Sequence, residues 1–164
     1  MSCLFDNLID ISERCSTFFE PTFYTTYIVP PTSTISSKIQ HNSKFYPYFC
    51  NAIGAIDGSH IPVTPPSHLR LRYRNRKGYL SQNALFTCDF DLRFTYALTG
   101  WEGSASDARV YGDAITSDLQ IPDGKYLLAD AGFPLSSKLL VPFRGVRYHL
   151  VEWERGLKRY DYTS

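Results

Sequence analysis

The chain has 164 residues, of which 43% are hydrophobic and 20% are charged, and its net charge is +1. This length and composition predict one globular domain, or one domain with an extra terminal segment, and exclude an intrinsically disordered chain. A net charge near zero excludes a uniformly basic surface, so a role with nucleic acid must rest on local clusters. No apolar run approaches the roughly 18 residues of a membrane span, and acidic residues interrupt the N-terminal region where a signal peptide would be apolar. We therefore expect no membrane association.

The first 44 residues differ in composition from the rest. Apolar residues recur at helical spacing over residues 1–19, which predicts an amphipathic helix. Residues 20–44 are rich in Pro, Thr and Ser and predict an irregular connection with a short helix near residues 35–40. The four cysteines form no CxxC pair, which predicts buried, reduced thiols in an intracellular protein. The main domain is expected over residues 45–164.

A strand with one acidic residue is predicted next. The stretch Asn51–Val63 is apolar enough for a buried central strand, yet it contains Asp57. Burying a carboxylate is costly unless a metal ion, a helix terminus or an arginine compensates its charge. The alternative interpretation is that Asp57 and Gly58 form only a tight turn between two apolar runs.

A run of basic residues follows the prolines that end this strand. Four arginines alternate with other residues, and a lysine adds a fifth charge: Arg70, Arg72, Arg74, Arg76 and Lys77. In an extended segment the four guanidinium groups would share one face, and such a face favours a phosphate backbone. Tyr73 would then stack on a base or simply pack. The alternative is a solvated edge strand that uses charge to prevent aggregation.

Two further strands and a helix are predicted in the middle of the chain. Residues 83–89 and 93–99 alternate as strands joined by a tight turn, with Phe86 and Tyr96 among their core residues. Ser104 or Ser106 caps a helix that runs to about Asp118. Because Asp107 in the first turn of this helix is explained by the helix dipole, we rank it below Asp57 and expect a supporting position beside the site.

A second strand ends in an acid. The apolar run Tyr126–Ala129 leads into Asp130, and strands that deliver an acid at their carboxyl end commonly form active sites in α/β sheets. A short helix is expected over residues 136–141, a turn over 142–145 and a last strand over 146–153.

The two acids are predicted to meet. If their strands are neighbours, Asp57 and Asp130 converge, and two close carboxylates require a cation to stay ionised. Oxygen ligands without Cys or His favour Mg²⁺ or Mn²⁺. Beside an arginine-rich edge, such a site predicts phosphodiester cleavage, in which one metal activates the attacking oxygen and the other stabilises the leaving oxygen.

Four motifs in order resemble the PIF/Harbinger transposases and their domesticated nuclease relatives. They are Gly54–Ile61, Tyr73–Gly78 with Ser81–Asn83, Gly103–Val110 and Leu128–Pro134, within a similarity that covers about residues 45–160. The resemblance implies an α/β, RNase H-like mixed sheet of three antiparallel strands, a helix and a further parallel strand. It also implies a DDE triad that cuts DNA with two divalent metals, in which Asp57 and Asp130 match the first two acids and Asp107 a further family aspartate. A nuclear location and a separate Myb-like DNA-binding partner protein are implied as well.

The third acid of the resemblance has no counterpart here. In the family it is a helical glutamate some tens of residues beyond the second aspartate, and Glu152 and Glu154 match the segment before that helix instead. The family's N-terminal helix-turn-helix is not evident in residues 1–44. We therefore expect a truncated transposase core, incomplete at its C-terminus and inactive in cleavage.

Two other classes of function stay open from the residues alone. One is a non-catalytic DNA- or protein-binding module that reuses the fold. The other is a hydrolase, acting on sugars for example, in which Asp57 and Asp130 form a metal-free acid/base pair. DNA binding that survives loss of both aspartates would favour the first, whereas an open aromatic groove without a cation site would favour the second.

Overall fold

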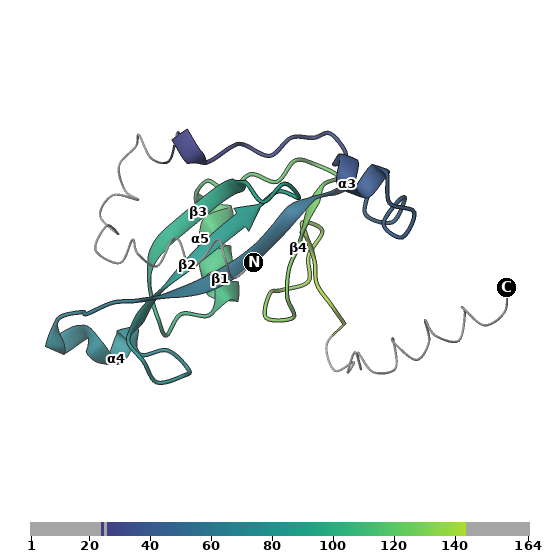
Figure 1. The fold of residues 1–164 in the computed structure, drawn as a ribbon. Coiled ribbons are helices and arrows are strands. Elements are labelled where there is room, and N and C mark those ends of the chain that lie inside the picture. The colour runs from purple at the N-terminus through teal and green to yellow at the C-terminus, as the bar shows by residue number, and fades with distance from the viewer. Residues whose placement is uncertain (1–23, 25, 144–164) are drawn as a thin grey trace, which may run out of the picture.

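The computed structural model describes Tyr24 and residues 26–143, in which five strands form one sheet (Figure 1). The elements in chain order are α3 (Ser37–Gln40), β1 (Ala52–Pro62), η2 (Ser67–Leu69), α4 (Arg70–Tyr73), β2 (Ser81–Cys88), β3 (Phe94–Glu102), α5 (Asp107–Ser117), β4 (Tyr126–Leu128) and β5 (Leu139–Leu140). The helix predicted over residues 1–19 and the strand predicted over 146–153 lie outside the described residues. None of the helices described is long and apolar enough to cross a membrane.

The strand order places β1 at the centre of the sheet. The order is β3-β2-β1-β4-β5, with β1, β2 and β3 antiparallel to one another and β4 parallel to both β1 and β5. Asp57 pairs with Phe86 of β2, so the strand runs straight through Asp57 and Gly58, and the tight-turn interpretation is wrong. This mixed sheet of three antiparallel strands, a helix and a parallel strand confirms the RNase H-like α/β prediction.

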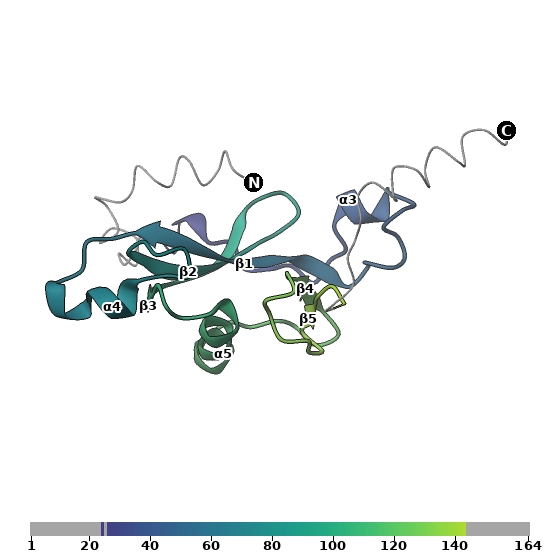
Figure 2. The same ribbon diagram turned by 90° about the horizontal axis from the view of Figure 1, so that it is seen from below.

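The core lies on one face of the sheet, under α5 (Figure 2). The helix follows Ser106 at its N-cap and buries Val110, Tyr111 and Ala114 against sheet residues that include Leu85 and Leu127. The predicted helix to about residue 118 is thereby confirmed, since its C-cap is Asp118. Residues at spacings of three and four along a helix share one face, which is why these three side chains meet the sheet together.

Two local predictions have different outcomes. The short helix near residues 35–40 is confirmed as α3, where the Ser36 hydroxyl accepts a hydrogen bond from the backbone of Lys38. The short helix expected over 136–141 is wrong, because Leu139 and Leu140 form β5 and pair with β4. Pro134 and Pro142 leave little room for a helix, and pairing with the edge of β4 satisfies the backbone instead.

The thiols that can be placed are free. Cys50 and Cys88 form no disulfide, as predicted, but each is half-buried rather than fully buried. Cys3 and Cys15 lie outside the described residues.

Candidate active site: two carboxylates at neighbouring strands

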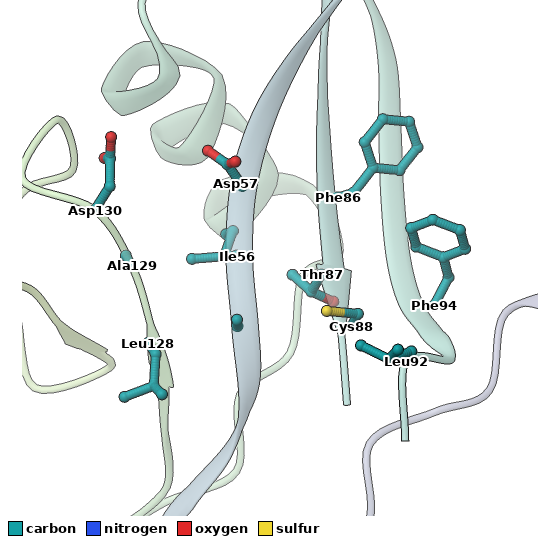
Figure 3. Close-up of a pocket in the computed structure, with 11 residues that line it drawn as sticks. Ile56, Asp57, Phe86, Thr87, Cys88, Leu92, Phe94, Leu128, Ala129 and Asp130 are labelled. Carbon is teal, nitrogen blue, oxygen red and sulfur yellow. The ribbon is translucent and has the colours of Figure 1, made fainter. Parts of the chain in front are cut away.

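Parallel pairing brings the two predicted acids together. Ala55 of β1 is opposite Leu128 of β4, and Asp57 and Asp130 each lie two residues further along in the same direction. Both side chains line one pocket of 310 Å³, whose wall also includes residues of β2 and β3 (Figure 3). The sequence separation of the two aspartates is therefore bridged by the parallel register, as expected for acids at adjoining strands.

Most of the pocket wall is apolar. The side chains of Phe86, Leu92, Phe94 and Leu128 contribute to it, together with half-buried Cys88 (Figure 3). The rings of Phe86 and Phe94 pack with their centroids 5.4 Å apart. An apolar wall lowers the local dielectric and strengthens every electrostatic interaction of the two carboxylates.

The protein environment disfavours the charged form of Asp57. Its pKa is raised, first by desolvation and then by the negative charges of Asp130 and Asp107. The backbone N–H of Gly58 donates to Asp57 Oδ1 over 2.8 Å and partly offsets this rise. The backbone N–H of Gly132 donates to Asp130 Oδ1 over 2.8 Å. A group of like charges in an apolar pocket is stabilised most directly by a bound cation.

This donor set fits a hard divalent cation. Asp57 and Asp130 provide only carboxylate oxygens, which Mg²⁺ and Mn²⁺ prefer, and water completes the coordination of such ions. In the part of the chain that the structure describes, no three His, Cys, Asp or Glu side chains gather closely enough to hold a metal ion between them. The two aspartates are therefore a partial ligand set.

Asp107 lies beside this pair but on the other face of β1. It begins α5, and its carboxylate packs against the backbone of Gly58, the residue after Asp57. Side chains alternate between the two faces of a strand, so Asp57 points to the pocket and Asp107 approaches from the side of α5. Asn83 of β2 donates to Asp107 Oδ1 over 2.8 Å. Sequence reasoning did not single out Asn83 for a role, although it belongs to the Ser81–Asn83 motif.

The basic run does not form the predicted extended strand. Residues 67–80, which we call the basic arm, contain η2 and α4 and close where Arg74 bridges to Leu80. The arm projects beyond the carboxyl end of β1 (Figure 1). The extended interpretation is wrong because, among the residues that the structure describes, no strand pairs with the segment before Arg74, and its backbone forms local helical hydrogen bonds instead.

The five basic residues of the arm divide into two groups. Arg72 forms a salt bridge with Glu102, and Arg74 Nη1 donates to the carbonyl of Gly78 over 2.8 Å. All five side chains are exposed, but three of them have no side-chain partner within the described chain: Arg70, Arg76 and Lys77. The predicted single face of four arginines is therefore replaced by two side chains that have partners in the chain and three that have none among the described residues.

A buried asparagine fastens the arm to the sheet. Asn75 is 6% exposed, and its Oδ1 accepts hydrogen bonds from the backbone of Lys77 and Tyr79. Its Nδ2 donates to Ser81 Oγ over 3.0 Å at the start of β2. These hydrogen bonds hold the backbone of the arm at the start of β2.

The fold and pocket together define a class of protein, an RNase H-like α/β domain with a two-carboxylate site on neighbouring parallel strands. The family described as DDE superfamily endonuclease matches residues 56–161, and the chain belongs to this family. A curated relative, Protein ALP1-like from Arabidopsis thaliana, is 29% identical over an alignment of 134 residues, and the match covers 70% of this chain. The chain spans about a third of that relative's length, 32%. No solved structure matches the chain. Endonucleases of the DDE superfamily generally use divalent metal ions.

Proposed function

We propose that this chain is a transposase-derived DNA endonuclease domain of the PIF/Harbinger type that binds Mg²⁺ or Mn²⁺ through Asp57 and Asp130. The observation that carries the proposal is the convergence of these two aspartates, from adjacent parallel strands, on one pocket. Membership of the DDE endonuclease family supports it independently of the geometry.

Each residue of the pocket has a defined task in this proposal. Bound metal ions would activate the attacking hydroxyl or water and stabilise the leaving oxygen of the phosphodiester. The N–H groups of Gly58 and Gly132 orient the two carboxylates, because each donates to one Oδ1 and leaves the other oxygen available. The apolar wall around Phe86 and Leu128 borders the two carboxylates and disfavours their unpaired charge, which a bound cation would compensate.

The degree of activity is a separate proposal. The described residues supply two acids to the pocket, whereas the family resemblance implies a triad of three. Two carboxylates hold a divalent ion less tightly and position it less well than three. From that resemblance we propose that the chain binds metal but is inactive, or nearly so, in DNA cleavage.

DNA contact is assigned to the three basic residues of the arm that have no partner in the described chain. Arg70, Arg76 and Lys77 are the members of the run without internal partners in the described chain, so they are available to phosphates. Arg72 and Arg74 act instead by holding the arm. A rigid, exposed basic arm outside the acidic pocket also favours a second candidate function, a non-catalytic DNA-binding module.

Three further proposals rest on the family resemblance and the composition. Residues 1–44 are an N-terminal helix and an irregular connection, and residues 45–164 are the nuclease domain. The protein acts in the nucleus. A separate Myb-like protein assists it in binding DNA.

The metal proposal is tested by calorimetric Mn²⁺ titration of the wild type, Asp57→Asn and Asp130→Asn. Each substitution removes one carboxylate charge, so we expect Mn²⁺ affinity to fall about tenfold or more. Asp113→Asn is the matched control, since Asp113 accepts a hydrogen bond from Trp101 Nε1 outside the pocket and should leave affinity unchanged. Equal affinity in all four proteins, or no binding by the wild type, would overturn the assignment.

Plasmid nicking in Mn²⁺ tests the proposal of inactivity. We expect the wild-type chain to leave supercoiled DNA uncut. Nicking that disappears in Asp57→Asn would refute inactivity while supporting the nuclease assignment. Nicking that persists in both aspartate variants would place the chemistry elsewhere.

The DNA contact is tested by neutralising the two groups of basic residues separately. The triple variant Arg70→Gln, Arg76→Gln, Lys77→Gln should weaken DNA binding and reduce the slope of log affinity against log salt by about 2 to 3. The control variant Arg72→Gln, Arg74→Gln removes two charges but should change the slope less, because those side chains already have partners. The reverse order of effects would contradict the assignment. DNA binding that is independent of Asp57 and of metal would favour the non-catalytic module.

A further inference from the structure

We infer that Asn83 is a positioning residue that holds the Asp107 carboxylate against Gly58, where its fixed negative charge strengthens divalent-cation binding at Asp57. This inference rests on the proposed metal site and assigns a task to three residues that do not themselves line its pocket. In this inference Asp107 does not bind the cation itself. Its negative charge acts on a cation held by Asp57 on the opposite face of β1.

The hydrogen bonds of Asn83 admit one orientation of its amide. Asn83 is 1% exposed, and its Nδ2 donates to the carbonyl of Ala105 over 3.1 Å and to Asp107 Oδ1 over 2.8 Å. Its Oδ1 is buried and has no hydrogen-bond partner in the described structure. Turning the amide over would bring Oδ1 against two acceptor oxygens, so the observed orientation is the favourable one. Leaving Asn83 Oδ1 without a hydrogen bond costs free energy. The hydrogen bond from Asn83 Nδ2 to Asp107 offsets part of this cost.

Gly58 provides the space for this contact. A Cβ at position 58 would overlap Asp107 Oδ1 and come close to Asp107 Cγ. The carboxylate therefore packs directly on the backbone of β1, next to the peptide that joins Asp57 and Gly58. Any larger residue at position 58 would move the carboxylate away from Asp57.

Capping of α5 does not explain this arrangement. An acid in the first turn needs only proximity to the helix terminus, and it can remain in solvent there. Here the Asp107 carboxylate on α5 instead accepts a hydrogen bond from the buried Asn83 amide of β2 and packs against Gly58 of β1. Charges held in this way, partly shielded from water, act on a nearby cation more strongly than exposed charges do.

The packing part of the inference is tested by a double-mutant cycle that needs no metal. Gly58→Ala should lower Tm in the wild-type background, because its Cβ meets the Asp107 carboxylate. In the Asp107→Ala background the same change should leave Tm unchanged or raise it, since alanine suits a strand better than glycine. An equal drop in Tm in both backgrounds would overturn the contact and the inference with it.

The electrostatic part is tested by Mn²⁺ calorimetry on Asp107→Asn. Asparagine keeps the size of the side chain and an oxygen that can accept from Asn83, so we expect the fold to be retained and Mn²⁺ affinity to fall about three- to tenfold. Asp113→Asn makes the same change in charge later in α5 and should leave affinity unaltered.

The failures of the two proposals are distinguishable. If the wild type and Asp107→Asn bind Mn²⁺ equally while Asp57→Asn does not bind, the metal site stands and the role of Asp107 is refuted. If Asp107→Asn and Asp113→Asn weaken binding equally, only overall charge matters, and the inference is again refuted. If the wild type binds no Mn²⁺, both the inference and the proposed function fall.

Discussion

The two faces of the sheet differ although the same strands form both. On the face covered by α5, Leu85 and Val110 are completely buried and belong to a continuous apolar core. On the opposite face, Phe94 and Leu128 remain partly exposed beside Asp57 and Asp130. Neighbouring residues along one strand therefore have different tasks: one side stabilises the fold, and the other presents the acids (Figures 2 and 3).

The difference explains how an acid can lie in the central strand. Asp57 points to the open face, where its carboxylate contacts solvent as well as apolar neighbours, so its burial is incomplete. A carboxylate at position 56, directed into the core, would pay the full cost of desolvation. A functional acid is tolerated in β1 because it occupies the pocket-facing register.

The largest expected effect is a difference in stability between alanine variants of two adjacent leucines of β4. Leu127 is 2% exposed in the core under α5, whereas Leu128 lines the pocket on the other face. Leu127→Ala should lower the free energy of unfolding by about 2–5 kcal/mol, since it leaves a cavity in packed surroundings. Leu128→Ala removes the same atoms from a partly solvated wall and should cost less than half as much. Urea unfolding of both variants measures the difference, and equal losses would show that both faces carry the fold alike.

Much of this asymmetry was predictable from the sequence. The apolar stretch around Asp57, the two following strands and the helix after Ser106 were all expected within a few residues of where they lie. Their alternation and capping signals are local, so a sequence pattern is sufficient to find them. The meeting of Asp57 with Asp130 followed from the assumption that their strands are neighbours, which the parallel register confirms.

The errors arose where long-range contacts decide the structure. The arginine alternation around Arg72 imitates a strand, but the segment turns into α4 and uses Arg72 to pair with Glu102 of β3. β5 forms because β4 offers an edge, which the local sequence of residues 136–141 does not reveal. The hydrogen bond from Asn83 to Asp107 likewise joins β2 to α5, and no local sequence pattern predicts it.

The second prediction concerns an acid whose removal should stabilise the apo protein. The folded structure raises the pKa of Asp57, first through desolvation, so at neutral pH, which is above the ordinary carboxyl value, this shift lowers the stability of the folded chain. Asp57→Asn should therefore raise Tm in the presence of EDTA and reduce the increase in Tm that Mn²⁺ gives the wild type. Differential scanning fluorimetry with and without Mn²⁺ measures both effects. A lower Tm in EDTA would indicate that the carboxylate supports the fold rather than a bound cation.

The smallest expected effect is on the pH dependence of stability and concerns Tyr96, on the face of the sheet covered by α5. Burial, and then a hydrogen bond of 2.7 Å from its hydroxyl to Asp118 Oδ1, raise the pKa of Tyr96 above its ordinary value near 10. The folded chain keeps this proton while the unfolded chain loses it above pH 10. The contribution to stability is therefore complete below pH 10 and is lost as the pH rises further, by about 1.4 kcal/mol per pH unit.

Tyr96→Phe isolates this contribution from those of the other tyrosines. At pH 8 the variant should be less stable by about 0.5–1.5 kcal/mol, because it lacks the hydrogen bond to Asp118. Above pH 10 the wild type should lose stability faster than the variant, so the gap between them closes. Urea unfolding of both proteins between pH 8 and pH 11 measures the gap. Parallel curves would mean that Tyr96 ionises as readily in the folded chain as in the unfolded one, and the packed face would then be more open to water than its burial indicates.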